Sequence, residues 1–199
     1  MHEQLFQTFN QLIPLGPQQR EELRRVTYPL ELPKGSLLLE RGQICNHLHF
    51  ILEGVVRAVH YDNWKEVIPW FGFEGDIVNS HLSFTYRQPS LESIILISDC
   101  KFLSITYESL QYLYSKDPIW QNLSRLFIER YYIDVQERLI SFLSLTAYER
   151  YEQLLQKYPD IEDRVNLGHI ASYLGIRQET LSNLRKRRRR HQCSQGKTN

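Results

Sequence analysis

The spacing of apolar and polar positions changes along the chain, and these changes in spacing divide it into segments. The first 28 residues carry apolar side chains at helical spacing, interrupted by two prolines; they are Leu5, Phe6, Phe9, Leu12 and Ile13, then Pro14 and Pro17. This pattern predicts a short helical lead-in. From residue 30 to 105, short apolar runs are separated by Gly, Asn and Asp at intervals of roughly ten residues. Such spacing is typical of a small antiparallel barrel or jelly roll, with Gly35, Gly42, Gly54 and Gly75 at its corners.

A long helix is predicted to follow the barrel. Residues 108–157 contain no glycine, and Pro118 stands where it would open a helix in its first turn. Apolar positions mark two stripes, one with Trp120, Leu123, Phe127, Tyr131, Val135, Leu139 and Phe142, the other with Leu126, Ile133, Ile140 and Leu143. We expect one side to cover the barrel and the other to meet the same helix of a second subunit across a twofold axis. The alternative is a helix buried within one monomer.

The segment from residue 164 to 190 carries the most informative pattern. Asn166 is a good N-cap for a helix that Gly175 would end in the left-handed conformation. A second helix over 178–187 would turn Leu181 and Leu184 inward, and the small Ala171 would let the two helices cross closely. This arrangement predicts a helix-turn-helix, whose second helix enters the major groove of DNA. A helical hairpin with a solvated polar face is the alternative.

Polar side chains should face outward from the second helix. Gln and Asn pair with adenine edges, Glu accepts from cytosine and Arg prefers guanine, so such a face can read bases. The basic run at 185–190 continues the helix and fits contacts to phosphates. The predicted DNA-binding residues are Arg177, Gln178, Glu179, Thr180, Ser182, Asn183, Arg185, Lys186, Arg187 and Arg188.

Charge is distributed unevenly between the body and the tail. Seven of the 24 Lys and Arg residues, and none of the 23 Asp and Glu residues, lie in the last 15 positions. The first 184 residues therefore carry a net charge of −6 and the last 15 of +7. This asymmetry favours a polyanionic partner for the tail, most often nucleic acid or an anionic membrane surface.

Several classes of protein are disfavoured by composition. No stretch approaches the roughly 20 apolar residues of a membrane-spanning helix, and the N-terminus does not look like a secretory signal, so we expect a cytoplasmic protein without a membrane partner. The three cysteines, Cys45, Cys100 and Cys193, form no CxxC pair, and we expect the first two to be free buried thiols. No nucleophile triad, phosphate-binding glycine loop or close carboxylate pair points to an enzyme, and we expect neither a cofactor nor a metal.

In this order, the motifs resemble those of the CRP/FNR superfamily of bacterial regulators, over roughly residues 10–187. The resemblance is carried by LPKGSLLLERGQ, HLHFILEGVVRAV, EGDIV, SDCKFLSI and IASYLGIRQETLSNLRK. It implies a homodimer on a twofold DNA site, with Glu179 as the base-reading glutamate and Thr180 as a backbone-contacting threonine. Gln178 and Asn183 stand where better-known members have arginines, which implies a different DNA consensus.

The same resemblance implies a changed effector pocket. Cyclic-nucleotide binders of the family hold the phosphate with Gly-Glu and Arg-Ser pairs, and these fall here at Asn79-Ser80 and Ser90-Leu91. The polar pair that contacts the base falls at Asp134-Val135. Since a buried phosphate needs a cationic partner, we expect no cyclic AMP binding in the family's manner. The cysteine cluster of iron-sulfur members is missing, and we expect no β-hairpin wing after the second helix.

A rival interpretation is a metal-dependent enzyme. Gly42, His47, His49 and Glu53 lie close to the first motif of metal-binding cupins, and two histidines two apart on a strand share a face. Alternation argues against it, because Leu48, Phe50 and Leu52 form the apolar set and should face the barrel interior, leaving His47 and His49 in solvent. A ligand-binding barrel module that does not touch DNA is the third interpretation.

Together these observations predict an α+β chain with a cyclic-nucleotide-binding-like barrel, a long dimerisation helix and a C-terminal helix-turn-helix. The expected divisions are 1–115, 116–146 and 147–199. The expected function is a sequence-specific DNA-binding transcription regulator, with double-stranded DNA and a second copy as partners. An unidentified small-molecule effector and RNA polymerase are further candidate partners.

Overall fold

The strands form two antiparallel sheets that face each other. The computed structural model describes residues 1–62 and 65–195, with side chains up to residue 190. The strands are β1 (Thr27–Leu32), β2 (Leu37–Leu39), β3 (His47–Glu53), β4 (Val56–Asp62), β5 (Lys65–Val67), β6 (Phe71–Gly72), β7 (Ile77–Val78), β8 (Ser93–Leu96) and β9 (Cys100–Thr106). One sheet has the order β1-β9-β3-β7, and the other has the order β2-β8-β4-β5 with β6 also paired to β4. The antiparallel roll expected from the sequence is confirmed.

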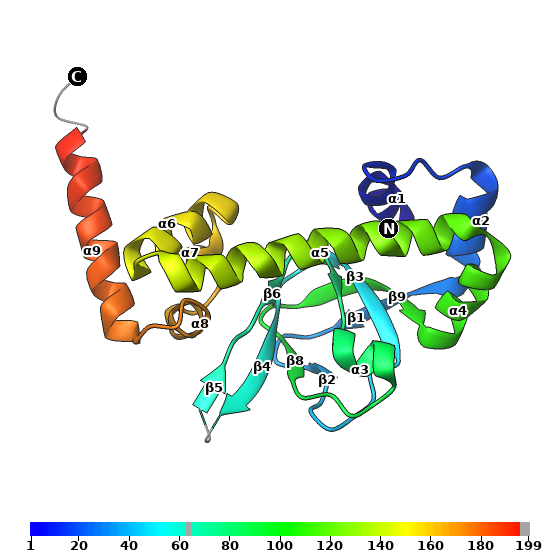
Figure 1. Cartoon of the computed structure of the whole chain (residues 1–199), viewed down its shortest axis with the longest axis horizontal. Coiled ribbons are helices and arrows are strands. Elements are labelled where there is room, and N and C mark those ends of the chain that lie inside the picture. The colour runs from blue at the N-terminus through cyan, green and yellow to red at the C-terminus, as the bar shows by residue number, and fades with distance from the viewer. Residues whose placement is uncertain (63–64, 196–199) are drawn as a thin grey trace.

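Helices precede the roll, follow it and extend past it (Figure 1). They are α1 (His2–Asn10), α2 (Pro17–Val26), α3 (His81–Tyr86), α4 (Tyr107–Lys116), α5 (Pro118–Ser144), α6 (Ala147–Lys157), α7 (Ile161–Arg164), α8 (Leu167–Tyr173) and α9 (Gln178–Gln195). Helix α5 runs across the roll and on to the C-terminal helices. Helices α1, α2 and α4 gather at its N-terminal end, and α6 to α9 gather at the other end.

The corner glycines have the backbone that the sequence predicted. Gly35, Gly42, Gly54 and Gly75 all have positive φ angles, between 83° and 102°. Gly54 is the most constrained of them, since a Cβ there would lie 2.5 Å from the Asp99 carbonyl oxygen. A side chain at this corner would therefore be excluded by sterics as well as by backbone strain.

Helices α1, α2 and α4 and the first turns of α5 cover the outer face of the β1-β9-β3-β7 sheet. Leu5, Leu23, Leu113 and Trp120 are each less than 5% exposed and belong to one continuous core with the strands. Cys45 and Cys100 are free and buried, as expected. This core anchors the N-terminal part of α5 rigidly to the roll.

Helix α5 begins as predicted but buries its stripes differently. Pro118 occupies its first turn, and the Asp117 side chain caps it by accepting a hydrogen bond from the Ile119 backbone N–H at 2.9 Å. Trp120 and Leu123 are buried, whereas both predicted stripes are exposed from Tyr131 onward. Buried and exposed apolar residues are thus separated along the length of the helix and do not lie on two opposite sides of it, because the roll covers only its first turns. Burial of the whole helix within one monomer, the alternative interpretation, is wrong.

The side chains of β3 that face the interior of the roll are not those that the sequence predicts. Leu48 and Phe50 face α1, α4 and α5 on the outside of the roll, while Ile51 points between the two sheets towards Gly72. His49, on the same side as Ile51, is only 7% exposed, and its Nδ1 lies 2.7 Å from the Ser104 Oγ. The expectation of a solvent-exposed His49 is therefore wrong. Both faces of this sheet are covered, so alternation could not identify the interior.

Burial gives His49 a measurable effect on stability. Desolvation, followed by the nearby His47, lowers the pKa of His49 from 6.5 to about 3. The unfolded chain therefore binds the proton first as the pH falls, and the folded state should lose about 2 kcal/mol between pH 7 and pH 5. Above pH 7 the effect vanishes. We expect His49→Gln to flatten this dependence in denaturant unfolding measured at several pH values. The same change at the exposed His81 is the control, and an equal slope in both variants would contradict the assignment.

Candidate nucleic-acid interface

Helices α8 and α9 are joined by a tight turn whose residues match the sequence pattern. The Asn166 side chain caps α8 by accepting a hydrogen bond from the Gly168 backbone N–H at 2.7 Å. Gly175 has a φ of 68°, and the Ile176 N–H donates to the Ala171 carbonyl oxygen at 3.0 Å. The chain therefore leaves α8 through a left-handed residue and reverses directly into α9.

One side of α9 packs into a second core. Leu181 is fully buried and Leu184 partly buried against Ile170 and Ala171 of α8. Further residues of this core come from α6, α7 and the roll, among them Tyr151, Leu154, Ile161, Phe71 and Phe73. The inward positions of Leu181 and Leu184 are confirmed, and they fix which side of α9 faces away from the protein.

The opposite side of α9 is polar and exposed. The exposed residues at its start, and Arg177 just before it, are ones for which the sequence predicts contact with DNA, namely Arg177, Gln178, Glu179, Thr180, Ser182, Asn183, Lys186 and Arg187. They combine side chains that can donate to and accept from base edges with side chains that attract phosphates. We call these residues, together with Arg190, the outer face of α9.

Arg185 and Arg188 do not belong to that face. The Arg185 Nε lies 2.8 Å from Glu162 Oε1, and its Nη2 donates to Glu162 Oε2 at 3.3 Å. The Arg188 Nε lies 3.0 Å from Glu152 Oε1. Both ion pairs are partly buried and tie α9 to α6 and α7. The sequence predicts that these two arginines bind DNA; in the structure their ion pairs hold α9 against α6 and α7.

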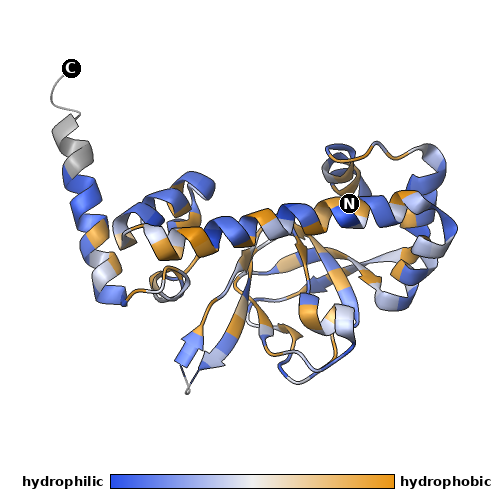
Figure 2. Cartoon of the chain, viewed as in Figure 1, coloured by the Kyte–Doolittle hydropathy of each residue, from blue (hydrophilic) through white to orange (hydrophobic). Residues whose placement is uncertain are grey.

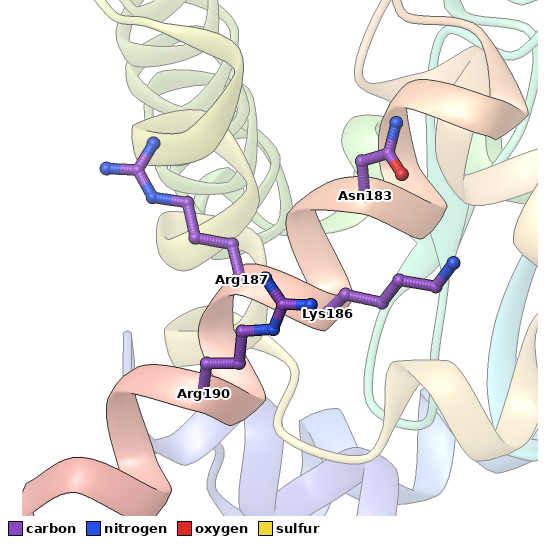
Figure 3. A pocket seen from close by; sticks show the side chains of 4 residues that line it. All are labelled: Asn183, Lys186, Arg187 and Arg190. Atoms are coloured by element: carbon purple, nitrogen blue, oxygen red, sulfur yellow. The ribbon is translucent and has the colours of Figure 1, made fainter.

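The outer face is basic along successive turns. Asn183, Lys186, Arg187 and Arg190 line a shallow hollow, and Figure 3 shows their side chains extending from neighbouring turns of α9. The Arg187 guanidinium also lies 4.8 Å from the Tyr148 ring centroid on α6. Helix α9 continues to Gln195, well past the predicted end at residue 187. Of the expected tail, residues 196–199 lie outside the described part, and up to residue 195 the chain contains this helix in place of a wing.

Helix α5 carries an exposed apolar surface between the roll and α6. Residues Ile128, Tyr132, Val135, Leu139 and Phe142 are spaced alternately by four and three positions, the spacing of a coiled-coil seam. Their exposed fractions range from 39% to 64%, and Leu143 beside them is 79% exposed. Figure 2 shows apolar segments continuing along α5 beyond the roll. A surface of this kind usually marks a contact with another protein chain.

The C-terminal helices are docked on the roll, a contact that the sequence did not predict. The Ser172 Oγ on α8 accepts from the Ile68 N–H at 3.2 Å and donates to the Glu66 carbonyl oxygen at 3.1 Å. Phe73 stacks on Tyr158 with ring centroids 4.4 Å apart, and Arg164 pairs with Glu74 at 2.5 Å. The β4-β5 hairpin and β6 thus hold the position of α8 and α9.

Inside the roll, Ser80 and Ser90, one residue from each of the two pairs that the sequence comparison placed at the phosphate site, lie side by side. The Ser90 Oγ donates to the Ser80 Oγ at 2.9 Å, and both residues are buried. Glu92 lies beside them and accepts from the Trp70 indole N–H at 3.2 Å. Desolvation raises the pKa of Glu92, although the carboxyl group is also hydrogen-bonded. Ser90 stands where cyclic-nucleotide binders would have a phosphate-binding arginine, and its neighbour is the carboxyl group of Glu92.

The described residues offer little support for a metal site or a membrane span. Within 1–62 and 65–190, His, Cys, Asp and Glu side chains form no group of three or more that could hold a metal ion, so the cupin interpretation has no ligand set there. None of the helices over the same residues combines the length and the hydropathy needed to cross a bilayer.

Comparisons with known proteins agree with this geometry. Residues 29–117 match the family model described as the cyclic nucleotide-binding domain. No curated protein matches the chain. Among solved structures, the c-di-GMP-responsive global regulator CLP of Xanthomonas campestris is similar, with a TM-score of 0.71 and 14% identity, over 88% of this chain and 93% of that one.

Two further structures extend the likeness. FixK2 of Bradyrhizobium japonicum has a TM-score of 0.69 and 16% identity, over 81% of this chain and 84% of that one. A protein from Eubacterium rectale described as a transcriptional regulator of the CRP/FNR family has a TM-score of 0.67 and 17% identity, over 85% and 82% of the two chains. Residues 29–117 therefore match the cyclic nucleotide-binding domain, and the chain has the same fold as these solved regulators.

Proposed function

We propose that this protein is a homodimeric transcription regulator that binds specific DNA sequences through α8 and α9 as a helix-turn-helix. The observation that carries the proposal is the two-sided character of α9. Its inner side is fixed by Leu181 and by the ion pairs of Arg185 and Arg188, while the outer face presents base-reading and cationic side chains to solvent. A rigidly held polar helix face is what reading a major groove requires.

The apolar surface of α5 supports the dimer. A second copy of the same helix would bury the seam from Ile128 to Phe142 in an isologous contact. This contact would place two α9 helices on one assembly, as recognition of a twofold DNA site demands. We keep 1–115, 116–146 and 147–199 as the proposed functional divisions and assign no catalytic role to any of them. Action on DNA implies the cytoplasm as the site of function, and RNA polymerase stays a candidate partner.

Binding of the outer face to phosphates can be tested by its salt dependence. We expect Lys186→Ala with Arg190→Ala to weaken binding to any duplex and to reduce the slope of log K against log salt. Two cations per subunit, or four per dimer, should lower the slope by about 3 to 4. Fluorescence anisotropy at several salt concentrations measures it. The control is Lys34→Ala with Arg41→Ala, which removes the same charge from the exposed surface of the roll. Equal slopes in the two double variants would refute this phosphate-contacting face.

We also propose that the protein does not respond to cyclic AMP in the manner of the family. The neighbouring Ser80, Ser90 and Glu92 offer no cation to a buried phosphate, and an ionised Glu92 would repel it. Isothermal calorimetry should therefore detect no cyclic AMP binding at micromolar concentrations. A micromolar dissociation constant for cyclic AMP would overturn this prediction.

A further inference from the structure

A cavity lies outside the roll, between the outer face of the β1-β9-β3-β7 sheet and the helices that cover this face. It is enclosed by α1, α2, α4, α5 and strands β1, β3, β7 and β9, and its volume is about 70 Å³. This is several times the roughly 10–15 Å³ that one water needs. It is separate from the buried serines and Glu92 and from the outer face of α9.

The lining of this cavity is almost entirely apolar. Leu5 and Phe9 of α1 close one side, and Trp120 and Leu123 of α5 close another. Thr27 and Ser124 are the two hydroxyl-bearing side chains in the lining. An apolar site of this kind repels water and gains free energy when an apolar molecule fills it.

Both lining hydroxyls already have partners. Thr27 Oγ1 donates to the Leu23 carbonyl oxygen at 2.7 Å and lies 2.9 Å from the His2 Nε2. The Ser124 Oγ accepts from the Tyr114 hydroxyl at 2.7 Å. Each lining hydroxyl therefore already has a hydrogen-bond partner, and the surrounding side chains are apolar, so the site selects against charged and strongly polar molecules.

The cavity has a side on which a ligand could enter. Most of the lining is deeply buried, whereas Leu48, Ile77 and Phe127 are only partly buried. Phe127 is also in edge-to-face contact with Phe9, with ring centroids 5.2 Å apart, so it joins α1 to α5 at this side. A molecule entering here would contact the helix that leads to the C-terminal unit.

We propose that this cavity is a binding site for a small uncharged apolar molecule, of the size of an aromatic ring or a short alkyl chain. Entry of a whole ring requires a small outward movement of α1, because the cavity is about half the volume of an engineered cavity of roughly 150 Å³ that binds benzene. Binding would be favourable because the ligand would make van der Waals contacts with lining atoms that now face empty space.

Benzene is the probe for the test, and Trp120 is the reporter because its ring lines the cavity. In the full-length chain labelled with 5-fluorotryptophan, we expect titration with benzene to shift the Trp120 fluorine signal saturably. Trp70 does not line the cavity, and its signal should stay in place. Glycerol at the same concentration should shift none of the three tryptophan signals.

Variants that fill the cavity make the result specific. Leu48→Phe and, independently, Ile77→Phe should weaken benzene binding at least tenfold, whereas Leu37→Phe on the exposed part of β2 should leave it unchanged. Circular dichroism establishes that each variant is folded. The proposal fails if benzene produces no saturable shift of Trp120 in the unsubstituted chain, or if a folded filling variant binds benzene as well as that chain does. Neither outcome bears on DNA binding, so the two proposals fail independently.

Discussion

Replacing Val135 and Leu139 with glutamate should abolish the proposed dimer and weaken binding to a two-half-site duplex by at least about 100-fold. Both side chains lie in the middle of the seam on α5, with exposed fractions of 44% and 59%. In a homodimer, four carboxylates would be forced together in an apolar contact, where unpaired charges are costly. The folded subunit should tolerate the change, because both positions face solvent in the single chain.

Sedimentation equilibrium measures the first effect and anisotropy with a two-half-site duplex the second. Leu37→Glu with Leu91→Glu is the matched control, since these residues are equally exposed but lie on the roll. The control should remain dimeric. A Val135/Leu139 variant that sediments as the unsubstituted protein does would rule out α5 as the dimer contact.

Glu179→Ala should relax sequence preference more than any other single change on α9. The side chain is exposed at the start of the helix, where it can accept a hydrogen bond from a base edge. Its loss should reduce discrimination at one base pair of each half-site by about 1–3 kcal/mol, which is roughly 5- to 150-fold. Affinity for unrelated duplexes should change little, since no phosphate contact is removed.

Competition between the preferred duplex, identified by selection from a random DNA pool, and single-base variants of it measures the discrimination between base pairs directly. Glu108→Ala on α4 removes the same charge far from α9 and should leave every preference intact. Asn183→Ala should relax a different position of the half-site. If Glu179→Ala changed neither affinity nor preference, the reading face would have to lie elsewhere on α9.

Local backbone chemistry was the part of this fold that the sequence predicted best. Gly54 and Gly175 require positive φ, Pro118 suits a first helical turn, and Asn166 caps a helix whatever surrounds it. These residues constrain their own turn by steric and hydrogen-bonding rules that need no knowledge of distant residues. The elements and their order could therefore be read from the chain.

Features that depend on distant packing were missed. The side of β3 that faces the interior could not be assigned, because helices cover the outer face of its sheet and bury Phe50 as well as Ile51. The pairing of Arg185 with Glu162 and of Arg188 with Glu152 depends on how α9 crosses α6 and α7. The Ser172 bridge to β5 joins residues more than 100 positions apart. A single sequence carries no local signal for such contacts.

Selection of bound duplexes from a random DNA pool tests the central claim most directly, because it reports binding, symmetry and spacing together. If two outer faces of α9 read successive major grooves, the enriched sequences should form an inverted repeat whose half-sites are centred about 34 Å, or one helical turn, apart. Enrichment of no sequence, or of a single half-site without a symmetric mate, would contradict the account.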